Sequence, residues 1–134
     1  MAAYPAPRAG DIVWCRFPEG AAVKPGRKSR PALVISVMGD SAPIRIRVAY
    51  GTSRRVAAVY PCEFVIAPED GEAFEVSGLS YPTKFNLRGT VVLPYTSDWF
   101  TAPPELPFGA TPKLGFLHPA LMERARSAAA KVHR

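Results

Sequence analysis

The sequence predicts a mainly β protein whose short strands are followed by one helix. Short runs of β-branched and aromatic residues recur along the chain, and 15 prolines and 10 glycines among 134 residues separate them. Helical periodicity is strong in one segment, residues 119–132 near the C-terminus. This combination is typical of a small, strongly bent antiparallel barrel, and the SH3-like barrel with a C-terminal α-helix is the expected form.

The first two predicted strands lie on either side of a basic loop. Residues 12–17, Ile-Val-Trp-Cys-Arg-Phe, have strand-forming side chains on both faces and end at Pro18. The following segment, up to residue 29, is rich in proline, glycine and basic residues, which predicts a flexible loop. Residues 32–37 form a near-continuous apolar run, which predicts a strand buried on both faces at the centre of the core.

The next predicted strand has two different faces. In residues 44–48 isoleucine and valine alternate with Arg45 and Arg47, so one face is expected to join the core while the other is cationic. Further strands are predicted over residues 62–66 and 89–94, with a possible sixth over residues 72–76.

The C-terminal helix is the clearest single element. His118 stands where a helix cap is expected, and Pro119 suits the first helical position because its missing N–H has no partner there. Apolar residues spaced along one side predict that the helix docks on the barrel. Its basic residues are expected to form a solvated face.

Bulk composition predicts a single domain over residues 1–134, with a loose leader over residues 1–9. The formal charge of +6 attracts polyanions, which makes nucleic acid the leading class of partner, although solubility alone also explains a basic chain. Cys15 and Cys62 lack the number and spacing of a disulfide framework or zinc site, and buried thiols are expected. No apolar segment is long enough to span a membrane, so we expect a cytoplasmic protein.

Familiar catalytic sets are missing from the sequence. It contains no G-x-x-x-x-G-K, H-E-x-x-H or G-x-S-x-G motif. The two histidines, His118 and His133, lie at a helix cap and at the chain end, which argues against a histidine acid–base pair. The acidic residues Glu69, Asp70 and Glu72 cluster at a turn, where a solvated surface is expected rather than a metal site. An enzyme built on this chain would use arginine and hydroxyl groups, with no metal and no cofactor.

Two motifs in order carry a specific resemblance. Gly10-Asp11-Ile12-Val13-Trp14, a basic loop and then Arg30-Pro31-Ala32-Leu33-Val34-Ile35-Ser36 resemble the opening of the MazF/PemK family of growth-inhibiting toxins. Segments 48–53, 77–83 and 114–115 resemble later landmarks of the family, so the likeness covers most of residues 10–132. Between residues 56 and 112 the sequence departs from the commonest members.

This resemblance implies an SH3-like barrel that acts as an endoribonuclease, and it implies two catalytic residues. The family's catalytic arginine corresponds to Arg30 and its catalytic hydroxyl to Thr52, with Ser53 as the alternative. The implied reaction is attack by the RNA 2′-OH on the adjacent phosphate, giving a 2′,3′-cyclic phosphate and a 5′-OH. Without the resemblance, Arg30 is interpreted as a surface arginine before a strand and Thr52 as a turn residue.

The implied substrate is single-stranded RNA, and the implied protein partners are an acidic antitoxin and a second copy of the chain in a homodimer. Basic side chains would contact phosphates, and an aromatic ring could stack an unpaired base or belong to the core. The candidate RNA-binding residues are Lys24, Arg27, Lys28, Arg45, Arg47, Tyr50, Arg54 and Arg55.

Two other classes of function stay open at this stage. The first is a nucleic-acid-binding or regulatory relative that keeps the barrel and the basic groove but has no turnover. The second is an interaction module that binds proline-rich peptides in an aromatic groove formed by Trp14, Tyr50, Trp99 and Phe100. Core burial is the competing explanation for those aromatic residues.

Overall fold

The computed structural model describes residues 4–18, 24–39, 43–102 and 111–132. In chain order the elements are β1 (Asp11–Cys15), β2 (Arg30–Met38), β3 (Arg45–Thr52), β4 (Glu63–Ile66), the 3₁₀ turn η1 (Pro68–Asp70), α1 (Glu72–Ser77), β5 (Thr83–Pro94), β6 (Lys113–Phe116), the 3₁₀ turn η2 (Pro119–Leu121) and α2 (Met122–Ala129).

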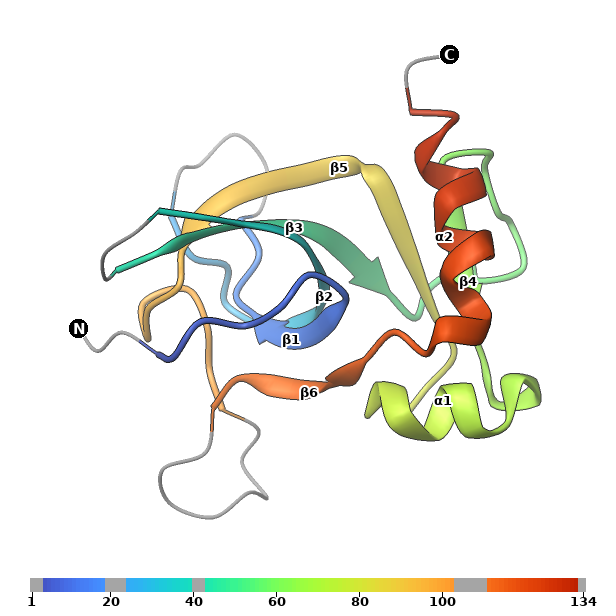
Figure 1. Ribbon diagram of the computed structural model, residues 1–134, viewed down its shortest axis with the longest axis horizontal. Coiled ribbons are helices and arrows are strands. Elements are labelled where there is room, and N and C mark those ends of the chain that lie inside the picture. Colours follow the sequence, from blue (N-terminus) through green and yellow to red (C-terminus); the bar gives the residue numbers. More distant parts are fainter. Residues whose placement is uncertain (1–3, 19–23, 40–42, 103–110, 133–134) are drawn as a thin grey trace.

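The strands form one antiparallel sheet in the order β4-β5-β3-β2-β1-β6. The sheet curls strongly, so that it makes a half-barrel with α2 packed beside it (Figure 1). The mainly β fold with a C-terminal helix, predicted from the sequence, is therefore confirmed.

A sharp bend in β5 divides the sheet (Figure 1). The register of β5 against β3 shifts between Ala49 and Tyr50 of β3, and residues 87–89 of β5 bulge out of the pairing there. The side-chain oxygen of Asn86 accepts hydrogen bonds from the N–H groups of residues 88 and 89, at 2.9 and 3.2 Å. A bulge of this kind bends a strand and increases its twist, so it explains how a six-stranded sheet curls on itself.

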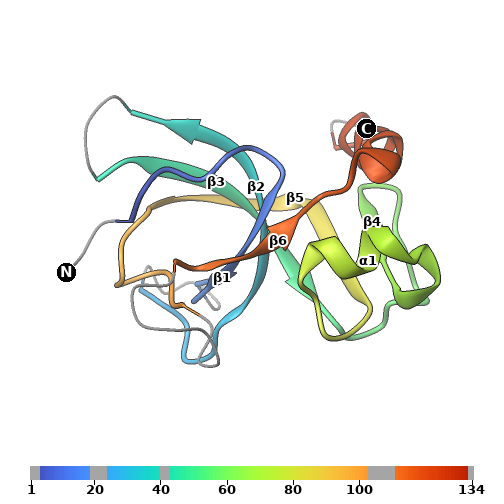
Figure 2. The ribbon, with the colours of Figure 1, turned by 60° about the horizontal axis from the view of Figure 1, so that its bottom comes forward.

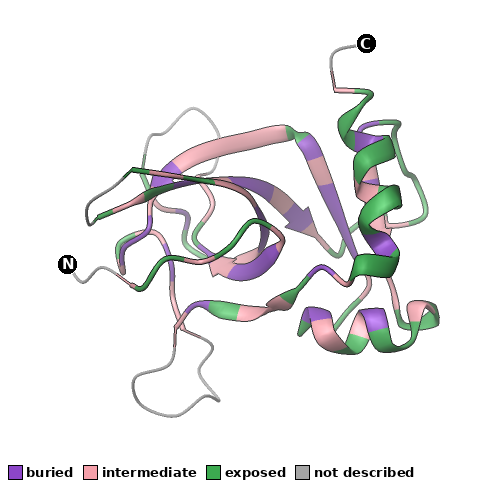
Figure 3. Ribbon diagram, viewed as in Figure 1, coloured by how far each residue is buried: buried purple, intermediate pink, exposed green. Residues whose placement is uncertain are grey.

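Two hydrophobic clusters lie on opposite faces of the central strands. Ile12 and Leu33 belong to the cluster that α1 and α2 cover, whereas their neighbours Val13 and Val34 belong to the cluster inside the half-barrel. Successive side chains of a strand point to opposite faces, so β1 and β2 are buried on both. The purple segments in Figure 3 follow these central strands. The predicted burial of the apolar run after Pro31 holds for its first half, and Val37 is exposed.

The prediction of a possible sixth strand over residues 72–76 is wrong, because this segment forms the helix α1. Ala73 and Ser77 are buried four residues apart, which is helical spacing, while Glu72 and Glu75 face away from the core. A window of five residues is too short to distinguish this pattern from strand alternation. The sixth strand is instead β6, and β5 begins at Thr83 rather than at residue 89.

The helical segment starts at Pro119 as predicted, but its first turn is the 3₁₀ turn η2, and α2 covers Met122–Ala129 rather than the whole predicted range 119–132. The Nδ1 atom of His118 accepts a hydrogen bond from the N–H of Ala120 at 2.9 Å, so His118 does cap this end. Arg124 is exposed, as expected for the solvated face, and it also donates to the carbonyl of Val65 at 2.8 Å and to Asp70 at 3.1 Å. Figure 2 shows α1, β4 and α2 together on one side of the molecule. Among the described residues no helix has the length and apolar character that crossing a membrane requires.

The surroundings of the Asp70 carboxylate lower its pKa. Burial raises its pKa, but the hydrogen bond from Arg124, the backbone N–H of Ala67 and the charge of Arg124 together lower it below the usual range. Asp70 therefore stays ionised near neutral pH and helps to hold α2 against η1.

Both cysteines are buried and free of disulfides, as the sequence predicts. Desolvation raises the pKa of the Cys15 thiol far above its usual range. The thiolate is the reactive form of cysteine, so Cys15 is chemically inert in the core.

Candidate functional site

A pocket of about 410 Å³ opens where β2 begins and β3 ends. Its wall also includes part of β1, the segment that follows α1, and β6. The lining residues are Trp14, Ser29, Arg30, Pro31, Gly51, Thr52, Ser53, Gly78, Leu79, Ser80, Tyr81, Thr83 and Leu114. A volume of this size is typical of small-molecule sites in proteins.

Strand pairing explains why Arg30 and Thr52 reach the same pocket. Ala32 pairs with Tyr50 in the antiparallel register of β2 and β3. Continuing that register by two residues places Arg30, the first residue of β2, opposite Thr52, the last residue of β3. Residues directly opposite each other in an antiparallel pair present their side chains on the same face, with Cβ atoms roughly 5 Å apart. Both side chains are half-buried.

Gly51 permits this close approach. A Cβ atom at this position would lie 2.6 Å from the carbonyl oxygen of Pro31 and 2.8 Å from the ring of Phe85. The β3 backbone is therefore packed between β2 and a fully buried aromatic ring, one residue before Thr52. A side chain here would push the two strand ends apart.

The two candidate hydroxyls differ in their surroundings. The Oγ1 atom of Thr52 accepts a hydrogen bond from the backbone N–H of Arg54 at 3.1 Å, which fixes the hydroxyl oxygen and leaves its proton available to an acceptor in the pocket. Ser53 also lines the pocket, but it is exposed. Thr52 is thus the better positioned of the two donors.

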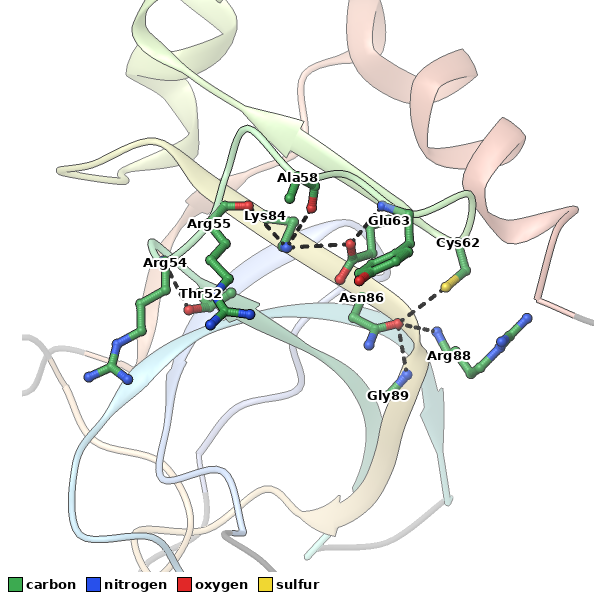
Figure 4. A network of polar contacts seen from close by, with 11 residues as sticks. Thr52, Arg54, Arg55, Ala58, Cys62, Glu63, Lys84, Asn86, Arg88 and Gly89 are labelled. Atoms are coloured by element: carbon green, nitrogen blue, oxygen red, sulfur yellow. Dashed lines mark hydrogen bonds and ion pairs between the residues drawn. The ribbon is translucent and has the colours of Figure 1, made fainter.

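A buried lysine holds the arginine turn, residues 53–58, that follows Thr52. The Nζ atom of Lys84 donates to the carbonyls of Arg55 and Ala58, at 3.1 and 2.9 Å, and makes an ion pair with Glu63 at 3.4 Å (Figure 4). Both charged side chains are less than a tenth exposed. Figure 4 shows that the carbonyl of Arg55, rather than its guanidinium, faces Lys84.

This anchoring offsets a strained backbone. Arg55 has a φ of 52°, in the left-handed region, where a side chain other than glycine costs about 1–2 kcal/mol. The hydrogen bond from Lys84 compensates for that cost by pairing the Arg55 carbonyl. Arg54 and Arg55 are exposed to solvent and follow the pocket residues Thr52 and Ser53 in the chain.

Other predicted RNA-binding residues are outside the pocket wall. Lys24, Arg27 and Lys28 are exposed in the loop that leads into Arg30, and they do not belong to the pocket wall. Arg45 and Arg47 lie at the opposite end of β3, where Arg47 donates to the hydroxyl of Thr90 at 3.2 Å.

The aromatic candidates are also separated. Tyr50 packs its ring edge against Phe17, with 5.1 Å between ring centroids, and does not line the pocket. Phe100 is completely buried, so Trp14, Tyr50, Trp99 and Phe100 do not form the aromatic groove that a proline-rich peptide requires. Of these four, Trp14 lines the pocket.

Sequence reasoning missed two residues that the structure places at or behind the pocket. Tyr81 lines it with a highly exposed ring, although the sequence signalled only the segment around it. Lys84 lies behind it, and no sequence pattern marks a lysine that will be buried against a glutamate 21 positions earlier.

The pocket favours anions. Arg30 is its one charged lining residue in the described part of the chain, and Ser29, Thr52 and Ser53 contribute hydroxyl-bearing side chains to the same wall. A guanidinium can bind two phosphate oxygens at once, and hydroxyls can donate further hydrogen bonds to the same group. Within the described ranges, no three His, Cys, Asp or Glu side chains are grouped closely enough to hold a metal ion.

The fold is similar to that of two solved endoribonucleases. An endoribonuclease from a mycobacterial species, in complex with its cognate antitoxin, superimposes with a TM-score of 0.58 at 18% identity, covering 96% of this chain and 95% of the other. A second endoribonuclease structure from a mycobacterial species has a TM-score of 0.58 at 17% identity, covering 96% and 92%. Models of protein families give no match, and neither do curated protein sequences.

Proposed function

We propose that this protein is a metal-independent endoribonuclease that cleaves single-stranded RNA and acts as the growth-inhibiting toxin of a toxin–antitoxin pair. The observation that carries the proposal is the meeting of Arg30 and Thr52 at one pocket, on a fold shared with endoribonucleases. These two positions also correspond to the catalytic residues implied by the resemblance to the MazF/PemK family.

The RNA itself supplies the nucleophile in the proposed reaction. The 2′-oxygen forms a bond to the adjacent phosphorus while the bond from phosphorus to the 5′-oxygen breaks. The 2′-OH proton passes to solvent and the leaving 5′-oxygen takes up a proton, which gives a 2′,3′-cyclic phosphate and a 5′-OH. The protein therefore needs to hold this geometry and stabilise the charge that builds on the phosphate oxygens.

Arg30 is assigned the stabilisation of that charge. Its guanidinium is permanently protonated and planar, so it can bind two phosphate oxygens as negative charge accumulates on them. A guanidinium holds its proton tightly and is a weak proton donor, so charge stabilisation is the main role assigned to Arg30. Its half-buried position strengthens the interaction relative to an exposed side chain.

Thr52 is assigned the orientation of the reacting groups. With its oxygen held by the N–H of Arg54, its proton can point at a phosphate oxygen or at the 2′-oxygen. Arg54 and Arg55, together with the basic loop before Arg30, would bind neighbouring phosphates of the strand.

The antitoxin and the homodimer are part of the same proposal. One of the matched structures contains an antitoxin, and a net charge of +6 on this chain suits an acidic partner segment that would occupy the cationic pocket. Expression of this protein in bacteria should arrest growth. Growth should continue when the matching antitoxin is expressed with it, or when the Arg30→Ala variant is expressed instead.

The decisive experiment incubates the purified protein with single-stranded RNA in the presence of EDTA and determines the product ends. The proposal predicts cyclic-phosphate and 5′-hydroxyl ends that depend on Arg30. Absence of cleavage, or complete loss of cleavage in EDTA, contradicts it.

A binding protein without turnover is the second candidate. It is favoured by the pocket wall, which contains no histidine, aspartate or glutamate in the described residues and so offers no side chain that titrates near neutral pH. RNA binding with unchanged RNA after prolonged incubation would support this alternative.

A further inference from the structure

Tyr81 is an unusually exposed aromatic residue on the wall of the pocket. Its exposed fraction is 69%, although aromatic side chains generally contribute most when buried. Tyr60 is exposed to the same degree, at 68%, but it lies away from this pocket. The chain therefore contains two similarly exposed tyrosines, of which one borders the candidate site.

The segment that carries Tyr81 is held at both ends. Before it, the buried Ser77 hydroxyl accepts from the N–H of Leu79 at 3.2 Å, and a Cβ at Gly78 would collide with the carbonyl oxygen of Leu114. After it, the Thr83 hydroxyl donates to the Tyr81 carbonyl at 2.9 Å. The exposed ring is thus mounted on a fixed backbone, which reduces the entropy lost when a ligand stacks on it.

The surroundings of Tyr81 suit a flat ring attached to an anion. Trp14 and Pro31, which pair across β1 and β2, supply apolar surface in the same pocket as the guanidinium of Arg30. A nucleotide combines these two chemical features, because its base has an apolar face and its phosphate is anionic. The pocket therefore has separate surfaces for a base and a phosphate.

We propose that the pocket is a nucleotide-binding site in which the Tyr81 ring stacks on one unpaired base of an RNA strand, next to the phosphate bound by Arg30. This inference rests on the proposed function for the identity of the polymer. It also gives a reason for single-strand preference, because a base inside a duplex cannot reach Tyr81 without losing its stacking and pairing partners.

The test measures binding of a fluorescein-labelled 2′-O-methyl RNA oligonucleotide by anisotropy, since this strand cannot be cleaved through its 2′-position. Loss of one base–aromatic stack should weaken binding of Tyr81→Ala by about 5- to 150-fold. Tyr81→Phe should bind like the wild type because it keeps the aromatic face. Tyr60→Ala is the matched control and should also bind like the wild type. Thermal unfolding confirms that each variant is folded.

A second arm locates the stacked base. In a series of oligonucleotides with one abasic position each, one position should abolish the difference between wild type and Tyr81→Ala, because the partner of the ring is then missing. Wild-type affinity for Tyr81→Ala, or equal losses in Tyr81→Ala and Tyr60→Ala, would overturn the inference. Tyr81-dependent binding without cleavage of ordinary RNA would refute the enzymatic proposal alone, and no RNA binding by the wild type would refute both.

Discussion

The two ends of β3 carry similar residues in different surroundings. At its start, Arg45 and Arg47 alternate with buried aliphatic side chains, and at its end Thr52 precedes Arg54 and Arg55. Seven residue steps along a strand separate the ends by roughly 20 Å. The pocket opens at the second end, where β2 begins, and none of its lining residues comes from the first end.

The difference teaches that the position of an arginine relative to other elements matters more than its place in a basic pattern. Alternating charges along a strand describe one solvated face of the sheet. The end at Thr52 differs because Gly51 lets two strands approach closely and because Lys84 holds the arginine turn in place.

Removal of the Arg30 guanidinium should have the largest effect. Arg30→Ala should lower the rate constant of RNA cleavage by about 10³-fold, as expected for a preorganised group that stabilises transition-state charge. Arg30→Lys should restore little, because an ammonium cannot bind two phosphate oxygens in the same way. Arg45→Ala, at the other end of β3, is the control. Equal losses at Arg30 and Arg45 in single-turnover assays would remove the distinction between the two ends.

Removal of the buried lysine should destabilise the protein. Lys84→Met leaves the Glu63 carboxylate buried without its cationic partner, and the free energy of unfolding should fall by about 3 kcal/mol. Denaturant unfolding measures this change. The double variant Lys84→Met, Glu63→Gln should recover part of the loss, and an unchanged stability of Lys84→Met would show that the arginine turn is not held by this contact.

The two candidate hydroxyls should differ in activity. Thr52→Val keeps the shape of the side chain but removes its hydroxyl, and we expect cleavage to slow by about 10²-fold. Ser53→Ala should have a smaller effect because that side chain is exposed. The measurement is the rate constant at saturating RNA for both variants, and a larger effect for Ser53→Ala would transfer the assignment to Ser53.

Charge removal at the two ends of β3 should change the salt dependence of RNA binding differently. Neutralising Arg54 and Arg55 together should reduce the slope of log affinity against log salt by about 1.4, since each phosphate contact to a single strand contributes about 0.7. Neutralising Arg45 and Arg47 should change the slope less. If the latter pair has the larger effect in a salt titration, the RNA follows β3 toward its start.

The smallest expected effect is that of a substitution at Asp70, a residue outside β3. Asp70→Asn should lower stability by about 1 kcal/mol or less, because its partner Arg124 is largely exposed. The folded-state pKa of Asp70 lies below the unfolded value, so this contribution is present above about pH 4 and disappears as the pH falls through the folded pKa. Unfolding at neutral and acid pH checks the sign, and cleavage by this variant should be unchanged.

Sequence periodicity predicted the elements whose pattern is long or strongly apolar. The helix after His118 and the buried run of β2 that follows Pro31 are examples. The first half of β5 was missed even though Phe85 and Leu87 alternate with polar residues there, and Lys84 is buried next to Phe85 through its pairing with Glu63 on a neighbouring strand. Such pairing depends on tertiary structure, so a local pattern does not reveal it.

The candidate site was predictable to a different extent. The resemblance selected Arg30 and Thr52, and the register of β2 and β3 places them at one pocket, while their catalytic roles stay predictions. Tyr50 was selected as a stacking residue, yet Tyr81 is the tyrosine in the pocket wall. Which aromatic residue of a strand or loop is exposed depends on the packing of distant elements, which the sequence does not state.

The most direct test is a double-mutant cycle on cleavage. If Arg30 and Thr52 act on the same phosphodiester, combining Arg30→Ala with Thr52→Val should slow single-turnover cleavage little more than Arg30→Ala alone, because groups that act as a unit are not additive. If the two losses multiply, the residues act independently, and the account of one shared reaction site is contradicted.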